Sequence, residues 1–156
     1  PQSDIEWMFL MQHYGLSTRL LDWSESSLIA LFFAVKHHEI NCDAAVWIFD
    51  PFEFNASINK MDTVPASTNR VFLKKYLLDT DGSKRIWFCE AEKPIAIRAV
   101  KNSTRILAQK GTFTIHGKEI IPIEDYVANF NKSGKGDKIR MTKLIIDGNK
   151  KFSLMK

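Results

Sequence analysis

The sequence contains few of the residues that mark a disulfide-stabilised or fibrous protein. Its 156 residues include two cysteines, Cys42 and Cys89, with seven glycines and five prolines. Two cysteines are too few for the disulfide framework of a small secreted domain, so we expect both to be reduced thiols in the cytoplasm. The remaining composition, 45% hydrophobic and 26% charged, is that of an ordinary globular protein and indicates neither disorder nor a fibrous repeat.

Long hydrophobic runs are also absent. The longest run, residues 28–35, has eight residues, whereas a helix that crosses a bilayer needs about eighteen. The first residues lack the basic start and the apolar stretch of a signal peptide. We therefore predict no membrane partner. The chain does not begin with Met, which we interpret as a sign that it is a fragment of a longer protein.

Positive charge is concentrated near the C-terminus. Residues 132–156 hold eight Lys and Arg residues against Asp137 and Asp147, a net charge of +6. The residues before them carry fourteen basic and sixteen acidic side chains, a net charge of −2. A basic segment of this kind can bind nucleic acid. A solvated, lysine-rich end is the commoner explanation, so nucleic acid is kept as an alternative partner of this basic C-terminal segment.

Local patterns predict a single mixed α/β domain over residues 1–156. Residues 24–38 are apolar on every side between Leu28 and Val35, which predicts a central, buried helix. We expect this helix to pack on a small, partly antiparallel β-sheet, either continuous or split. Other helices are predicted at residues 3–15, 52–58, 70–78, 105–109 and 122–130, and strands at residues 44–49, 95–100, 112–116 and 139–146.

Hydrogen-bonding side chains are unusually dense in residues 12–22, between two predicted helices. A buried Arg or Asp is costly unless it has a partner, so Arg19 and Asp22 either pair with each other or face a ligand. In the structural interpretation the segment is a rigid corner, with His13 capping a helix end. In the functional interpretation the same groups face a pocket at the start of the next helix, where free amides favour a phosphate or carboxylate. Both interpretations remain open.

A second dense segment spans residues 105–111. If its first residues are helical, Arg105 and Gln109 lie one turn apart on the same face, and Gly111 closes the helix. A guanidinium beside an amide suits an anion that is flanked by a hydrogen-bonding group. The alternative is a surface turn whose Arg makes a minor ion pair.

Motifs of established chemistry are missing elsewhere. The sequence shows no zinc-ligand spacing, no complete P-loop and no nucleophile elbow. We therefore predict no metal site. A hydrolase built around His13 and Asp22 is the weakest of the hypotheses.

Two segments resemble the FRG domain family. Residues 12–35, QHYGLSTRLLDWSESSLIALFFAV, resemble its most characteristic stretch, which has Gln-His-His/Tyr-Gly, Thr-Arg-Leu-Leu-Asp-Trp and a helix with Ala-Leu-(Phe/Tyr)-Phe-Ala. Residues 105–117, RILAQKGTFTIHG, resemble its second stretch, an Arg upstream of Gln-x-Gly-x-Phe. The resemblance implies a bacterial or phage protein with an α/β fold.

The chain departs from the family pattern at both ends. The Phe-Arg-Gly tripeptide lies upstream of the Gln-His segment in the family and is absent here. The family also continues past its last strand into a further helix. The resemblance therefore implies an FRG-like domain that lacks its N-terminal Phe-Arg-Gly portion and a C-terminal helix.

A remoter similarity connects the sequence with ADP-ribosyltransferases. The tripeptide at residues 22–24 is similar in position to their Ser-Thr-Ser, judged by its spacing to Ala30 and Phe33. Gln109 falls near the position of their Glu, whose charge stabilises the developing positive charge on the ribose. An amide does not supply that charge, so Gln109 would weaken such chemistry. The similarity makes NAD the candidate cofactor.

The leading hypothesis is an FRG-type module that binds a nucleotide-like, phosphate-bearing ligand, with ADP-ribosyltransferase-like transfer as its candidate activity. Two arginines would bind the anion, and the amides and the imidazole would supply directional hydrogen bonds. The alternative is a non-catalytic interaction module that binds nucleic acid or a protein partner. The candidate catalytic residues are His13, Arg19, Asp22 and Gln109, and the candidate ligand-binding residues are Gln12, Thr18, Ser24 and Arg105.

Overall fold

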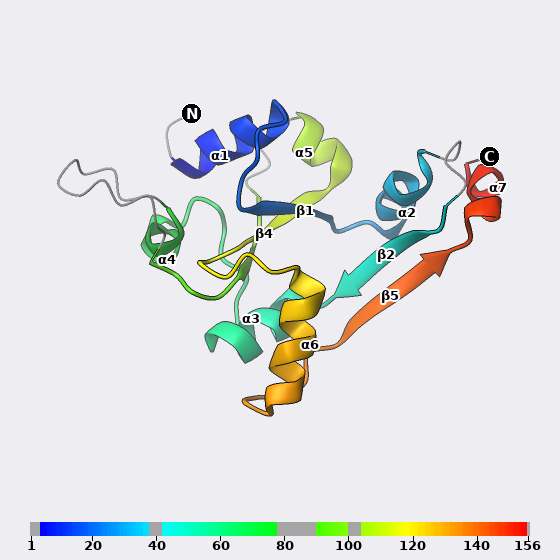
Figure 1. The fold of residues 1–156 in the computed structure, drawn as a ribbon. Helices are drawn as coiled ribbons and strands as arrows, with labels where there is room; N and C mark the ends of the chain where they lie inside the picture. The colour runs from blue at the N-terminus through cyan, green and yellow to red at the C-terminus, as the bar shows by residue number, and fades with distance from the viewer. Residues whose placement is uncertain (1–3, 38–41, 78–89, 100–103, 156) are drawn as a thin grey trace.

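The computed structural model describes residues 4–37, 42–77, 90–99 and 104–155. Five strands form two separate antiparallel sheets (Figure 1). The first sheet has the order β1-β4-β3, and the second sheet pairs β2 with β5. Their bounds are β1 Leu20–Ser24, β2 Ala44–Phe49, β3 Ile95–Ile97, β4 Gly111–Ile115 and β5 Met141–Ile146.

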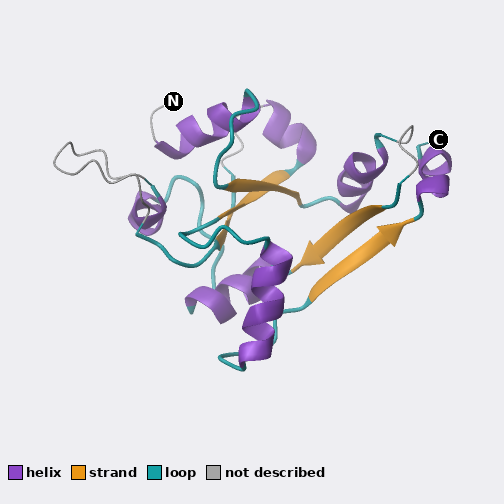
Figure 2. Cartoon of the chain, viewed as in Figure 1, coloured by secondary structure: helices purple, strands orange, loops and turns teal. Residues whose placement is uncertain are grey.

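Helices lie beside both sheets, as Figure 2 shows. The predicted mixed α/β class is therefore confirmed, with the sheet split into two small antiparallel parts. The helices are α1 Asp4–His13, α2 Ser27–Val35, α3 Pro51–Asn59, α4 Arg70–Leu73, α5 Thr104–Gln109, α6 Ile123–Ser133 and α7 Lys151–Leu154. Two 3₁₀ turns, η1 Lys74–Tyr76 and η2 Gly148–Lys150, follow α4 and precede α7.

The core has two clusters of buried side chains on either side of β3. One cluster contains Ile95 and Ile97 and extends to Ile5 of α1. The other contains Ala96 and extends to Phe54 of α3 and Ile123 of α6. Alternate residues of a strand point to opposite faces, so both faces of β3 are covered. The strand predicted at residues 95–100 is therefore present as the shorter β3. Its three residues are all buried, instead of alternating between buried and exposed.

Helix α3 is well defined by its ends. The carboxylate of Asp50 accepts hydrogen bonds from the backbone N–H groups of Phe52 and Glu53, at 2.8 and 3.3 Å. Pro51 occupies the first turn, where its fixed φ suits a helix start. Lys60 ends the helix in a left-handed conformation with φ 56°. The predicted turn of helix at residues 52–58 is therefore a longer helix.

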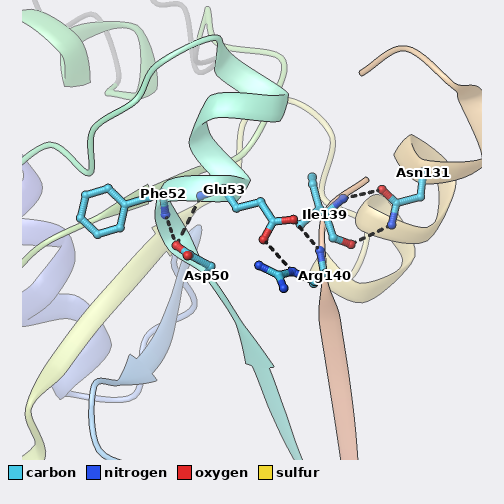
Figure 3. A network of polar contacts seen from close by, with 6 residues as sticks. All are labelled: Asp50, Phe52, Glu53, Asn131, Ile139 and Arg140. Carbon is cyan, nitrogen blue, oxygen red and sulfur yellow. Dashed lines mark hydrogen bonds and ion pairs between the residues drawn. The ribbon is translucent and has the colours of Figure 1, made fainter. Parts of the chain in front are cut away.

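Polar contacts connect α3 and α6 to the segment that enters β5 (Figure 3). The side-chain amide of Asn131 donates to Ile139 O and accepts from Ile139 N, each at 2.9 Å. Glu53 accepts from the backbone N–H of Arg140 at 3.1 Å and from its guanidinium at 3.4 Å. The basic C-terminal segment therefore contributes a strand and a helix to the fold, in addition to solvated lysines.

The helix predicted at residues 24–38 is present as α2, but the prediction that it is central and buried is wrong. Helix α2 contacts β1, β2 and α7, and Val35 is its one buried residue. Leu28 is 76% exposed, and Phe32 and Phe33 are also exposed. The neighbours of α2 cover only part of its circumference, so an apolar composition on all sides does not bury it. The helix with most buried residues among those described is α3.

Candidate functional site

The end of α1 and the start of β1 bring three of the predicted site residues together. Thr18 Oγ1 donates to Gln12 Oε1 at 2.7 Å, and Gln12 Nε2 donates to Asp22 Oδ1 at 2.9 Å. Thr18 Oγ1 also accepts from the backbone N–H of Leu20 at 3.2 Å. Gly15, with φ 78°, makes the turn that reverses the chain between these groups. The chain of hydrogen bonds orients the Asp22 carboxylate.

Arg19 does not pair with Asp22, which corrects one of the two predicted arrangements. Its guanidinium donates to the backbone carbonyls of Tyr76 and His116. In extended chain, residues three positions apart point to opposite faces. Arg19 therefore connects the start of β1 to two distant segments, and its role in ligand binding stays a prediction.

The two dense segments of the sequence meet through the first sheet. Because β1 pairs with β4, the end of β1 lies beside the end of α5, which precedes β4. Ser24 Oγ donates to Gln109 O at 2.8 Å and accepts from the backbone N–H of Ser26 at 3.1 Å. The backbone N–H of Glu25 donates to Lys110 O at 3.0 Å. Ser24 is thereby fixed against the segment that carries Gln109.

The remaining predicted site residues are His13 and Arg105. His13 ends α1, is exposed and makes an edge-to-face contact with Tyr14, with ring centroids 5.2 Å apart. Arg105 belongs to α5, but its side chain lies outside the described residues. The predicted convergence of Arg19 and Arg105 therefore stays a prediction.

A cleft of about 550 Å³ lies where β1, β2 and α2 meet the ends of α5 and α6. Three predicted site residues, Asp22, Ser24 and Gln109, line it. Its volume is within the usual range of about 300–1,000 Å³ for small-molecule sites. The other lining residues are Leu21, Trp23, Ala30, Phe33, Ala34, Ala45, Val46, Trp47 and Glu124.

Glu124 and Trp47 are two lining residues that the sequence patterns did not single out. Glu124 is in the first turn of α6, where an acidic residue is common because it favours the positive end of the helix dipole. That ordinary explanation hides it in the sequence. Trp47 lies in an apolar strand and looks like a core residue. Only the packing of α6 and β2 beside β1 brings them to Asp22.

Two carboxylates and three aromatic side chains line the cleft. Asp22 and Glu124 are its ionisable lining residues. Lys143, which is opposite Trp47 in the β2–β5 register, places its Nζ 5.1 Å from the centroid of the Trp47 ring. A cation therefore lies next to one wall. Tyr126, further along α6, has a pKa raised above 10.0 because it is partly buried and near Glu119.

The described residues lack two further features. They contain no group of three or more His, Cys, Asp or Glu side chains placed to hold a metal ion. No helix within the described ranges is long and apolar enough to cross a membrane.

Part of the chain is similar to a known protein family. Residues 1–42 match the model of the FRG domain. The match includes the network of Gln12, Thr18 and Asp22 and the whole of α2, and it confirms the resemblance in that part of the chain. The second FRG-like stretch, residues 105–117, lies beyond the match. No curated protein and no solved structure matches the chain.

Proposed function

We propose that the chain binds a nucleotide-like ligand of the NAD type in the cleft between β1, β2 and α6. The observation that carries the proposal is the convergence of Asp22, Gln109 and Glu124 with aromatic walls in one cleft of about 550 Å³. These residues come from segments far apart in the sequence. A cleft of mainly apolar walls with a few convergent polar groups is the usual form of a small-molecule site.

The polar side chains that line the cleft suit the sugar of a nucleotide. Carboxylates commonly accept hydrogen bonds from ribose hydroxyls, and Asp22 is held in place for this by Gln12. Glu124 offers a second carboxylate in the same cleft. The Gln109 side chain can both donate and accept. The two carboxylates would repel a phosphate. We therefore assign the sugar of the ligand to Asp22 and Glu124.

The aromatic walls and Lys143 suit the rest of such a ligand. Trp23, Phe33 and Trp47 line the cleft, and stacking of a base on an aromatic side chain contributes about 1–3 kcal/mol. The Trp23 indole is fixed by donation to Thr114 Oγ1 at 3.1 Å. Lys143, beside the Trp47 ring, is the cation that we assign to the phosphates.

Transfer of ADP-ribose from NAD is the activity that the remote similarity implies. Such a reaction needs a carboxylate near the ribose that becomes positively charged as nicotinamide leaves. Gln109 does not supply this charge, whereas Glu124 lies in the same cleft. If the chain is an enzyme, we assign this role to Glu124.

The proposal is tested by calorimetric titration of NAD, AMP and adenosine into the protein. Glu124→Gln and Asp22→Asn each replace a charged acceptor by a neutral one, and hydrogen bonds to charged groups contribute about 1.5–3 kcal/mol. We expect NAD to bind saturably and each variant to weaken binding at least about tenfold. Asp125→Asn is the matched control, because Asp125 is the exposed neighbour of Glu124 on α6.

A second pair of variants separates the phosphates from the nucleoside. Lys143→Ala should weaken NAD and AMP about tenfold and leave adenosine unchanged, while the exposed Lys150→Ala should change none of them. Absence of binding by all three ligands would overturn the proposal, as would equal affinities in Glu124→Gln and Asp125→Asn. Release of nicotinamide at saturating NAD, lost in Glu124→Gln, would establish the catalytic role.

A further inference from the structure

A second, larger cleft lies on the other side of the residue 12–22 segment. It has a volume of about 710 Å³ and is bounded by α1, β1 and the residues that follow β4. Its walls are mainly apolar, and Leu21 is shared with the first cleft. The apolar side chains that matter for the argument are Trp7, Met8, Met11, Leu77 and Ile120.

Arg19 is the cationic group of this cleft, and it is held in position. Its Nη1 donates to His116 O at 3.3 Å, and its Nη2 donates to Tyr76 O. A guanidinium has five N–H donors, so these two carbonyls leave further donors available. Among the described residues, no carboxylate pairs with Arg19. The guanidinium is therefore not paired with a described carboxylate, and part of its hydrogen-bonding capacity is left for a ligand.

The other polar side chains limit what can bind beside Arg19. The His116 ring lies near two backbone carbonyls, Arg19 O at 3.4 Å and Ile121 O at 3.2 Å, so we assign it a structural role. Asp4 lines the cleft at the start of α1. One guanidinium together with one carboxylate in the wall favours a ligand with a single negative charge, because a doubly charged phosphate would be repelled more strongly by Asp4.

The apolar walls fit a flexible hydrocarbon group. Trp7, Met11 and Ile120 are exposed, although side chains of this type are more often buried. They line one cleft together with Arg19 rather than being scattered over the surface. Methionine side chains adapt to irregular shapes and are frequent on surfaces that bind varied apolar partners. A carboxylate matches the planar guanidinium, with which it can form two parallel hydrogen bonds.

The geometry points to a binding site for a small amphipathic carboxylate, of the medium-chain fatty acid type, in the cleft between α1 and β1. The carboxylate binds the available N–H groups of Arg19. The hydrocarbon chain lies against Trp7, Met8 and Met11. This site is independent of the proposed nucleotide site, because Arg19 does not line the first cleft and Glu124 does not line the second.

Decanoate is a suitable probe, with decanamide as its neutral isostere. Binding is measured by calorimetry and by the fluorescence of Trp7, with Trp7→Phe identifying its share of the signal. We expect one decanoate to bind per chain, at least about tenfold more tightly than decanamide, since a charged partner strengthens the hydrogen bond to Arg19. Equal affinity for the two probes would overturn the proposal.

Two variants locate the site. Met11→Glu places a negative charge in the apolar wall and is expected to weaken decanoate at least tenfold. Val71→Glu, the same kind of change at a residue that is 88% exposed on α4 and outside the cleft, should leave binding unchanged. Equal effects of these two variants would show adsorption to exposed apolar surface and would sink the proposal.

Arg19→Lys tests the guanidinium itself, with thermal unfolding as a check on the fold. A folded Arg19→Lys protein should bind decanoate about tenfold more weakly, and undiminished affinity would count against the assignment. If this variant unfolds, Met11→Glu still decides the question. NAD titration of Met11→Glu should match the unmodified protein. Failure at this cleft therefore remains distinguishable from failure of the proposed nucleotide site.

Discussion

The two sheets use similar apolar residues in opposite environments. The three residues of β3, Ile95–Ile97, are all buried. In β5, Met141–Ile146, the four central residues are exposed. Each strand contains two isoleucines, so the isoleucine content alone does not explain the difference. It arises because β3 has a core cluster on each face, whereas β5 pairs with β2 alone in a two-stranded sheet.

The edge of the first sheet at β3 is also covered by hydrogen bonds. Strand β3 is at an edge, but the side chain of Asn55 accepts from Ala96 N and donates to Ala96 O, each at 2.9 Å. Next to it, Arg98 N donates to Pro65 O, and Ser67 N donates to Arg98 O. A covered edge cannot recruit another strand. Strand β3 and helix α3 are therefore fixed by contacts on all sides, while β2 and β5 depend mainly on each other.

The largest expected difference comes from two isoleucine truncations. Ile97 is fully buried and Ile145 is 67% exposed. We expect Ile97→Ala to lower the free energy of unfolding by about 2–5 kcal/mol and Ile145→Ala to lower it by less than about 0.5 kcal/mol. Urea denaturation of both variants measures this. Similar losses would show that β5 is covered in solution and would break the comparison of the two sheets.

Two asparagines provide the next test, because each bonds to both backbone groups of one residue. Asn55 holds Ala96 and is fully buried, whereas Asn131 holds Ile139 and is partly exposed. Asn55→Ala leaves the buried N–H and C=O groups of Ala96 without their partner. This should lower the free energy of unfolding by about 1–3 kcal/mol for each group. Asn131→Ala should cost about 1 kcal/mol, because water can replace its hydrogen bonds. Denaturant midpoints of the two proteins give the order, and a reversed order would contradict the burial argument.

The smallest expected effect concerns the ion pair that joins α3 to the start of β5. The Arg140 side chain is 86% exposed, and its Nε lies 3.4 Å from Glu53 Oε2. Exposed pairs contribute about 0–1 kcal/mol and are screened by salt. Arg140→Ala should therefore cost under about 1 kcal/mol at low salt and nothing measurable at 1 M salt. Glu53→Ala should cost more, because the Arg140 backbone N–H also donates to Glu53. Equal losses in the two variants would exclude this added contribution.

Local sequence patterns located most of the secondary structure. The strand predicted at residues 44–49 coincides with β2, and the alternating residues 112–116 differ from β4 by one residue at each end. The helix predicted at residues 3–15 is present as α1, Asp4–His13, and Gly15 makes the turn that follows it. By contrast, the helix at residues 105–109 is followed by Lys110 in the positive-φ conformation, with φ 46°, before Gly111 begins β4. Turn geometry of this kind depends on the strand pairing that follows.

The sequence by itself determined most of the local elements and the FRG-like stretch that the domain match confirms, because these depend on short-range periodicity and on residues that are adjacent in the chain. Only the tertiary structure decided that Ser24 meets Gln109, that Glu124 joins the cleft and that Arg19 belongs to another one. It also decided that the most apolar helix lies at the periphery. These outcomes depend on which strands pair and which faces they cover, and contacts between distant segments leave no periodic signal in the sequence.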